Sequence, residues 1–265
     1  MGVQQDICAL VKFPQVVNRL TGTLFRKELI VIEDPDLNLL VYNALSFGTA
    51  VMLGAFVYFL TQISSVSKKY RSSVAASAVV VGIAGYHYYR IWSGSSAGEL
   101  NEGYRYADWL ITVPLLIVEL LIVLGTSAER RKSLMMTLVP ATALMIGLGY
   151  PGEVSTDDGT KWLFWVLAML PFVYILYVLV NELKQVKSRE NAAIAGLINN
   201  ATKILLATWM VYPITYLFPV FFEYPHDGAE TARQLGYTIA DITAKAGYGL
   251  AILAIAKARS ASEPN

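Results

Sequence analysis

Residues 235–257 read LGYTIADITAKAGYGLAILAIAK, an apolar stretch with an acid and an amine in its middle. The stretch is long enough to cross a bilayer, for which a helix needs about 20 mostly apolar residues. On a helix, Asp241 and Lys245 are four residues apart and share one face. Ionisable groups at that depth cost about 2.5–3.5 kcal/mol each and mark ion paths, proton relays or ligand counterions. A structural ion pair between helices is the simpler alternative, and a buried lysine can also form a Schiff base with an aldehyde.

The composition is that of an integral membrane protein. The chain has 265 residues, of which 55% are hydrophobic and only 15% are charged, whereas soluble domains carry about 25% charged residues. Its mean hydropathy is positive. A net charge of +1 gives no reason to expect nucleic acid as a partner. A single cysteine and two histidines far apart in sequence argue against an intramolecular disulfide framework and against a metal site.

Seven segments are each about long enough to span a membrane. They are predicted at residues 38–63, 71–93, 104–126, 133–150, 160–182, 193–222 and 231–258. Pro140 in the fourth span, and Pro213 and Pro219 in the sixth, predict kinks. We therefore expect an all-α membrane protein, a seven-transmembrane-helix bundle formed by residues 37–258, followed by a tail at 259–265.

The connecting segments predict the orientation of this bundle. The loops after spans one, three and five are basic (SSVSKKYRSS, GTSAERRKS, ELKQVKSREN), and those after spans two, four and six are acidic (SGSSAGELNEG, PGEVSTDDG, EYPHDGAE). The positive-inside rule then places the N-terminus outside the cell and the C-terminus in the cytoplasm. Residues 1–36 lack the apolar core and cleavage site of a signal peptide. They are interpreted as an extracellular segment with a short amphipathic helix that lies on the membrane or caps the bundle.

The third span carries the most informative pattern, YRYADWLITVPLLIVELLIVLG at residues 104–125. At 100° per residue, Thr112 lies about 40° and Glu119 about 20° from Asp108 around the helix, so the three share one stripe. The two carboxyl groups are separated by a rise of about 16 Å. Asp108 is expected in the extracellular half and Glu119 in the cytoplasmic half, as two stations for a proton. The structural alternative is that Arg105 pairs with Asp108 and Glu119 bonds a neighbouring helix.

His87, in the second span, is predicted at nearly the same depth as Asp108. A histidine at that depth can pair with the carboxylate. The alternative is that its ring bonds a backbone carbonyl among the surrounding tyrosines, in the sequence GYHYYRIW.

Several of these motifs resemble one family. RYADWLITVPLLIVEL resembles the third helix, and GYTIADITAKAGYG the seventh, of the proteorhodopsins and xanthorhodopsins, which are microbial rhodopsins and bacterial light-driven proton pumps. GYHYYR, GYPGEV, YILYVL and ATWMVYPITY match in the same order. The resemblance covers the chain from about Leu37 to Ala258.

The resemblance implies roles for the buried ionisable residues. Lys245 would hold all-trans retinal as a protonated Schiff base. Asp108 would be its main counterion and the first proton acceptor, and Asp241 the second counterion. Arg105 would lie just outside them as a gate, and His87 would partner Asp108.

The resemblance also implies a proton donor and a retinal pocket. Glu119 would return a proton to the Schiff base from the cytoplasmic side, which makes the chain an outward proton pump and not an enzyme. The pocket would be lined by Trp109, Thr112, Leu116, Met145, Gly149, Trp165, Trp209 and Tyr212. Aromatic residues suit a rigid polyene, although at helical spacing they also form ordinary cores.

Two positions distinguish among relatives within this resemblance. Leu116 resembles the green-absorbing type, whereas blue-absorbing relatives often have glutamine there. Trp165 falls where carotenoid-binding xanthorhodopsins have a glycine that opens a window to retinal, so no carotenoid antenna is expected. The resemblance also implies a homo-oligomer, a pentamer or trimer, in the lipid of a bacterial inner membrane.

Two other functions remain open from the sequence. The first is a sensory rhodopsin that signals through a separate transducer; Glu119 and the absence of a fused output domain in residues 1–265 count against it. The second is a seven-span transporter or receptor with a structural Lys–Asp pair, which predicts no visible absorption after retinal is added.

Overall fold

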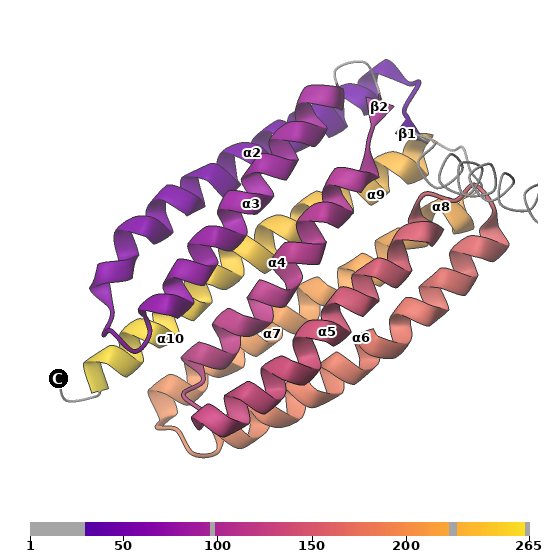
Figure 1. The fold of residues 1–265 in the computed structure, drawn as a ribbon. Coiled ribbons are helices and arrows are strands. Elements are labelled where there is room, and N and C mark those ends of the chain that lie inside the picture. Colours follow the sequence, from indigo (N-terminus) through magenta and orange to yellow (C-terminus); the bar gives the residue numbers. More distant parts are fainter. Residues whose placement is uncertain (1–29, 96–98, 223–226, 263–265) are drawn as a thin grey trace, which may run out of the picture.

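In the computed structural model, which describes residues 30–95, 99–222 and 227–262, seven long helical rods run side by side (Figure 1). Six of the rods are α2 (Pro35–Gln62), α3 (Arg71–Ser95), α4 (Glu102–Val123), α5 (Ala128–Glu153), α6 (Asp158–Lys187) and α7 (Ala192–Tyr216). The seventh rod is continuous through α9 (Asp227–Asp241), the π-helical segment η2 (Ile242–Gly247) and α10 (Tyr248–Ser262). The prediction of an all-α seven-helix membrane bundle is confirmed.

Most of the rods are long and apolar enough to cross a membrane. Six helical stretches of the described chain meet this criterion, all of the rods except α3. The seventh rod is the most enclosed, because 61% of its most apolar window is buried, against 17% for α6. The rod that carries Asp241 and Lys245 is therefore interior, and α6 faces outward.

Side-chain caps mark where five of the helices begin, and in four of them the cap is an aspartate or an asparagine. The carboxylates of Asp34 and Asp157 accept hydrogen bonds from backbone amides in the first turns of α2 and α6. The side chains of Asn101 and Asn191 do the same for α4 and α7. These are residue types that satisfy the free N–H groups of a first turn. The cap at Asn101 sets where α4 starts and so the depth of every residue on it.

A small strand pair was not predicted. β1 (Ile30–Val31) pairs antiparallel with β2 (Glu99–Leu100), with Ile30 opposite Leu100. Ile30 and Leu100 pack in a buried cluster with Tyr88 of α3. The pair ties the chain before α2 to the α3–α4 connection, immediately before the Asn101 cap.

Several boundaries differ from the sequence prediction, and α5 extends past the expected 133–150 at both ends. Span six, expected at 193–222, divides into α7 and the short helix α8 (Phe218–Phe221). Pro213 lies inside α7, whereas Pro219 is in the first turn of α8, where a proline ring is tolerated. The N-terminal segment was predicted to extend to residue 36, but α2 already begins at Pro35. The amphipathic helix predicted within that segment lies outside the described residues.

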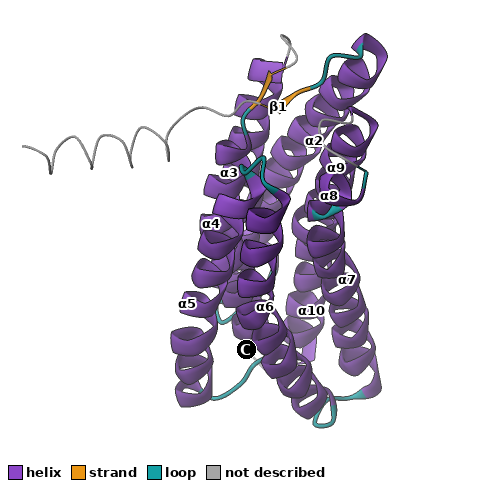
Figure 2. Cartoon of the chain, turned by 90° about the vertical axis from the view of Figure 1, so that its right-hand side faces the viewer, coloured by secondary structure: helices purple, strands orange, loops and turns teal. Residues whose placement is uncertain are grey.

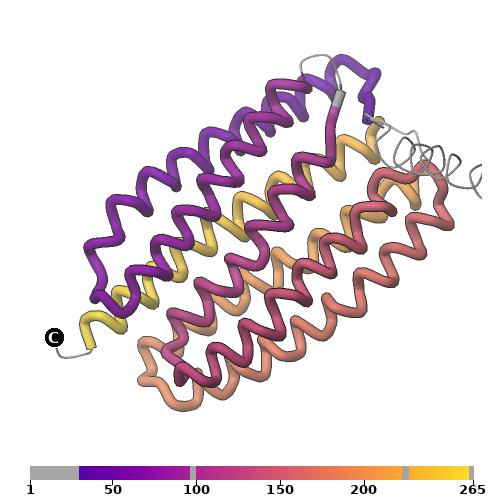
Figure 3. The backbone as a smooth tube through the Cα atoms, viewed as in Figure 1, coloured from indigo at the N-terminus to yellow at the C-terminus, as the bar shows by residue number. Residues whose placement is uncertain are grey.

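The two ends of the bundle are distinct. Figure 2 shows the strands at one end of the helices, here called the strand end, and Figure 3 shows that α10 ends at the opposite end, here called the C-terminal end. Following the tube in Figure 3, the α2–α3, α4–α5 and α6–α7 connections gather at the C-terminal end. Which end faces the cytoplasm stays a prediction from the charge of the loops.

Candidate functional site

Lys245 is the centre of the site. Its side chain is buried, and Nζ lies 3.1 Å from Oδ1 of Asp241 and also pairs with Oδ2 of Asp108. Lys245 and its two neighbours in sequence belong to the π-helical segment that begins directly after Asp241. Short π-helical segments within α-helices are frequent at functional sites. One buried amine thus stands between two buried carboxylates from different helices.

Asp241 is held by several donors. The hydroxyls of Tyr88 and Tyr212 donate to it over 2.9 and 2.8 Å, and Nε1 of Trp109 donates to it over 3.1 Å. The guanidinium of Arg105 lies 3.7 Å from its Oδ2. Both oxygens of this carboxylate therefore have partners besides Lys245.

Asp108 has a different environment. Its Oδ2 pairs with Lys245, but Oδ1 is buried without a hydrogen-bond partner among the described residues. Thr112 does not supply one, since its hydroxyl donates to the backbone carbonyl of Asp108 over 2.9 Å. An ionised carboxylate with a bare oxygen is costly to bury. Of the two carboxylates, Asp108 is the one with room to accept a proton.

Glu119 lies further along α4, toward the C-terminal end. Its carboxyl group is fully buried, and Oε2 accepts a hydrogen bond of 2.5 Å from the hydroxyl of Ser77. The other oxygen has no partner among the described residues, and the described ion pairs include none with Glu119. A buried carboxyl without a cation is far cheaper as the neutral acid than as the anion.

The structure gives neither Arg105 nor His87 a described hydrogen bond or ion pair with Asp108. Arg105 donates to Glu102 over 3.1 Å and to Tyr88 over 3.1 Å, and it approaches Asp241, whereas no described ion pair joins it to Asp108. Nδ1 of His87 lies 3.0 Å from the carbonyl oxygen of Ile83, which is a backbone carbonyl as in the alternative, but one turn before the tyrosines named there. Among the described contacts, none is a hydrogen bond between His87 and Asp108.

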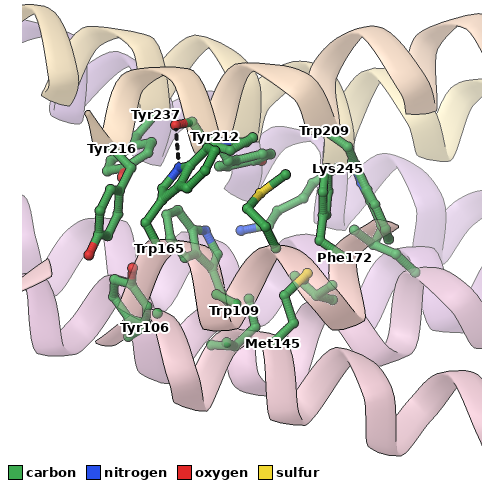
Figure 4. A pocket seen from close by; sticks show the side chains of 17 residues that line it. Tyr106, Trp109, Met145, Trp165, Phe172, Trp209, Tyr212, Tyr216, Tyr237 and Lys245 are labelled. Carbon is green, nitrogen blue, oxygen red and sulfur yellow. Dashed lines mark hydrogen bonds between the residues drawn. The ribbon is translucent and has the colours of Figure 1, made fainter. Parts of the chain in front are cut away.

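A mostly apolar pocket surrounds the Lys245 amine. Figure 4 shows the Lys245 side chain entering a group of aromatic rings that includes Trp109, Trp209 and Tyr212. Seven of the eight predicted lining residues belong to it: Trp109, Leu116, Met145, Gly149, Trp165, Trp209 and Tyr212. The eighth, Thr112, is buried and bonded to the α4 backbone, and is not part of the lining.

Other pocket residues were missed from the sequence. They are Tyr106, Val113, Ile146, Ala168, Met169, Phe172, Pro213, Tyr216 and Tyr237. Phe172 stacks near Trp209, with ring centroids 6.5 Å apart, and closes one side. Apolar and aromatic residues of this kind carry no signal in the sequence that separates a pocket from an ordinary core.

The pocket fits a long apolar aldehyde that bonds the lysine. Flat rings flank the space, the reactive amine projects into it, and two carboxylates beside Nζ would balance a positive charge there. Retinal has these properties, and Lys245 with the rings of Trp109, Trp209 and Tyr212 would hold it.

Comparisons with known proteins agree with this geometry. Residues 42–259 match the family of bacteriorhodopsin-like proteins. The green-light absorbing proteorhodopsin of Gamma-proteobacterium EBAC31A08 is 30% identical over 231 residues, which are 86% of this chain and 91% of that protein.

Two solved structures are similar in fold and sequence. Xanthorhodopsin, described as a light-driven ion pump with dual chromophore, has a TM-score of 0.81 and 44% identity, over 86% of this chain and 96% of its own. A thermophilic rhodopsin has a TM-score of 0.81 and 40% identity, over 88% and 98%. The prediction drawn from the motifs is confirmed, and the chain belongs to the bacteriorhodopsin-like family of microbial rhodopsins.

Proposed function

We propose that this protein is a light-driven pump that moves protons outward, with retinal held on Lys245 as a protonated Schiff base. The observation that carries the proposal is the pair of buried carboxyl groups on one stripe of α4. Asp108 touches the Lys245 amine, and Glu119 lies about 16 Å further along the helix axis. As a rhodopsin-family protein it is assigned to ion transport and not to enzymatic catalysis.

Proton acceptance is assigned to Asp108. When bound, retinal supplies the light-driven change of shape that displaces the Nζ–H bond from its carboxylate partners. The proton of Lys245 Nζ then passes to Asp108, whose Oδ1 is free of other donors, whereas Asp241 stays ionised because Tyr88, Tyr212 and Trp109 donate to it.

Proton return is assigned to Glu119. The neutral acid is the form that its surroundings favour, because Ser77 is the one described side-chain hydrogen-bond partner of the Glu119 carboxyl group. It can therefore give a proton to Nζ of Lys245 and then recover one from the C-terminal end of the bundle. By the charge of the loops, that end faces the cytoplasm, so each cycle moves a proton outward.

The pocket walls support two finer assignments. Nε1 of Trp165 donates to the backbone carbonyl of Pro213 over 2.9 Å, the dashed line in Figure 4, which fixes its indole in the wall between α6 and α7. A second chromophore such as a carotenoid would have to displace this ring, and we propose that none binds. Leu116 also lines the pocket, and we propose that it leaves the absorption in the green.

The cellular setting is proposed on the same basis. Exposed apolar side chains such as Leu170 and Val173 of α6 suit contact with lipid. We propose a multi-pass protein of a bacterial inner membrane, assembled as a pentamer or trimer, with protons as its transported ion.

Matched variants of the two counterion carboxylates test this mechanism. Asp108→Asn should remove proton transfer from Nζ and so abolish light-driven pumping, while the visible band shifts but persists. Asp241→Asn should perturb colour and rates without removing the acceptor. Flash photolysis of the purified variants follows deprotonation of the chromophore directly. Normal deprotonation in Asp108→Asn, together with its loss in Asp241→Asn, would reverse the two assignments.

A further inference from the structure

A second network of buried charges lies between Lys245 and the strand end. Arg105 donates from Nε to Glu102 over 3.1 Å and from a terminal nitrogen to the amide oxygen of Gln234 over 2.8 Å. The amide nitrogen of Gln234 donates in turn to Glu102 and, over 2.7 Å, to Glu230. Arg233 continues the chain with an ion pair of 2.7 Å to Glu230. The network links the start of α4 to the start of α9.

Glu153, the last residue of α5, ends this network. Its Oε1 pairs with Arg233 over 2.9 Å, and its Oε2 lies 3.1 Å from the hydroxyls of both Tyr106 and Tyr237. Both tyrosines line the pocket, and their rings lie 5.0 and 5.1 Å from that of Trp109. Only 4% of Glu153 is exposed, so the carboxyl group is enclosed and coupled to the pocket wall.

The buried charges between Lys245 and the strand end do not balance if every group is ionised. Among the described residues, three cations in the two connected networks face five carboxylates: Lys245, Arg105 and Arg233 against Asp108, Asp241, Glu102, Glu153 and Glu230. A further buried cation, Lys161 of α6, forms an ion pair with the exposed Asp158. The backbone carbonyl of Lys161 accepts a hydrogen bond from the hydroxyl of Tyr216 of α7. Surplus buried charge is costly, so at least one carboxyl group holds a proton.

The hydrogen-bond partners indicate which carboxyl group is neutral. The described partners of Glu102 and Glu230 are guanidinium and amide N–H groups, which only donate. A protonated oxygen would have nothing to donate to there. At Oε2 of Glu153 both partners are phenol hydroxyls, which donate or accept. A proton on this oxygen can be donated to one tyrosine while the other still donates to the carboxyl group.

We propose that Glu153 is the proton-release group of the pump, storing a proton at rest and losing it to the outside after light is absorbed. This inference rests on the proposed outward pumping. When Asp108 takes the proton from Lys245, the positive charge of Lys245 and the negative charge of Asp108 disappear together. This changes the electrostatic field at Asp241 and Arg105, which join the site to the network of Glu153. Glu153 gives its proton to external water and later regains the proton held by Asp108, so the protons balance over a cycle.

Another acidic residue at this end fits the role less well. Asp227, at the start of α9, is half-buried and accepts a hydrogen bond of 2.8 Å from the backbone amide of Asp34. It has no described contact with a pocket residue. Asp227→Asn therefore serves as a matched control, because it removes a carboxylate from the same end and keeps an acceptor for that amide.

The first test uses the resting, retinal-loaded protein in the dark. Infrared spectra of the wild type should contain a carboxylic acid C=O band that is lost in Glu153→Gln and kept in Asp227→Asn. The Gln side chain keeps the size and hydrogen-bonding ability of the glutamate, and the visible band reports correct folding. A wild type and Glu153→Gln with the same carboxylic acid bands would overturn the proposal, whether or not the protein pumps.

The second test times the proton with a pH-sensitive dye after a flash. The wild type should release a proton before it takes one up. In Glu153→Gln the released proton must come from Asp108 itself, so release should follow uptake, while Asp227→Asn keeps the wild-type order. An unchanged order in Glu153→Gln, in a wild type that pumps, would overturn the role of Glu153. A wild type with no light-driven release would instead contradict the pump.

If Glu153→Gln does not fold, an experiment on the wild type alone still tests the proposal. Time-resolved infrared spectra should show a carboxylic acid losing its proton when the dye reports release. Release without such a loss contradicts the proposal.

Discussion

Asp108 and Asp241 share one lysine but differ in every other contact. Asp241 accepts from Tyr88, Tyr212 and Trp109, whereas one oxygen of Asp108 has no described partner. Sequence spacing placed Asp241 on the same helical face as Lys245, and the resemblance of the motifs implied that Asp108 lies beside the same lysine. Neither could tell which acid is fully hydrogen-bonded, since those donors come from three other stretches of the chain.

Glu119 gives a prediction at the same scale. Glu119→Gln should leave the colour and the first proton transfer intact but slow the return of the proton to Lys245, because no neighbouring acid remains. Recovery should then slow further as the pH rises, since the proton must come from solution. Flash photolysis across a pH series measures this.

The control for that experiment is another buried acid near the C-terminal end. Glu182 of α6 is paired with Arg130 over 2.6 Å, and Glu182→Gln should recover at the wild-type rate. Equal recovery in Glu119→Gln and the wild type at all pH values would remove Glu119 from the mechanism.

At the scale of elements, the helices were predictable and their junctions were not. Apolar runs and loop charges located all seven rods, because a bilayer imposes one length and one composition on each. The strand pair, the end of α7 and the π-helical segment at Lys245 depend on contacts or backbone geometry that leave no periodic signal. The network from Glu102 to Glu153 was also missed, because acids and arginines at helix ends look like solvated loop residues.

Close packing between α2 and α10 gives a prediction about stability. A Cβ added at Gly249 would lie 2.6 Å from the buried ring of Phe59, whereas one added at Gly196 would meet no atom within 4 Å. Gly249→Ala should therefore destabilise the protein by about 1–3 kcal/mol through overpacking, and Gly196→Ala should be neutral or stabilising by up to about 1 kcal/mol. Thermal bleaching of the visible band measures both. Equal midpoints for the two variants would contradict the packing.

The cap of α6 gives a prediction about pH. Hydrogen bonds from the Thr160 hydroxyl and backbone amide lower the pKa of the exposed Asp157 carboxyl group. A lowered pKa in the folded state contributes stability above the ordinary aspartate value, about 3.9, and that stability is lost as the pH falls through the folded-state pKa. Asp157→Asn keeps the capping acceptor but cannot titrate.

The wild type should accordingly lose its stability advantage over Asp157→Asn as the solution is acidified. Bleaching midpoints of the two proteins at neutral and acidic pH give the comparison. A difference between them that does not change with pH would show that the carboxylate charge contributes nothing to the cap.

At the scale of the molecule, the rods place the three proposed proton sites in order along the bundle. Glu119 lies toward the C-terminal end, Lys245 with Asp108 lies in the middle, and Glu153 lies near the strand end. The sequence predicted the first two because both are charges inside apolar spans. It could not rank Glu153 above other acids, because its burial depends on tyrosines and an arginine from α4 and α9.

Light-driven acidification tests the central claim most directly. Cells expressing the chain with added all-trans retinal are illuminated with green light in unbuffered salt while external pH is recorded, with and without a protonophore, beside the Lys245→Ala variant. We predict acidification that the protonophore abolishes and that the colourless variant lacks. Alkalinisation enhanced by the protonophore would mean that another ion is moved, and a coloured protein with no pH change would contradict pumping.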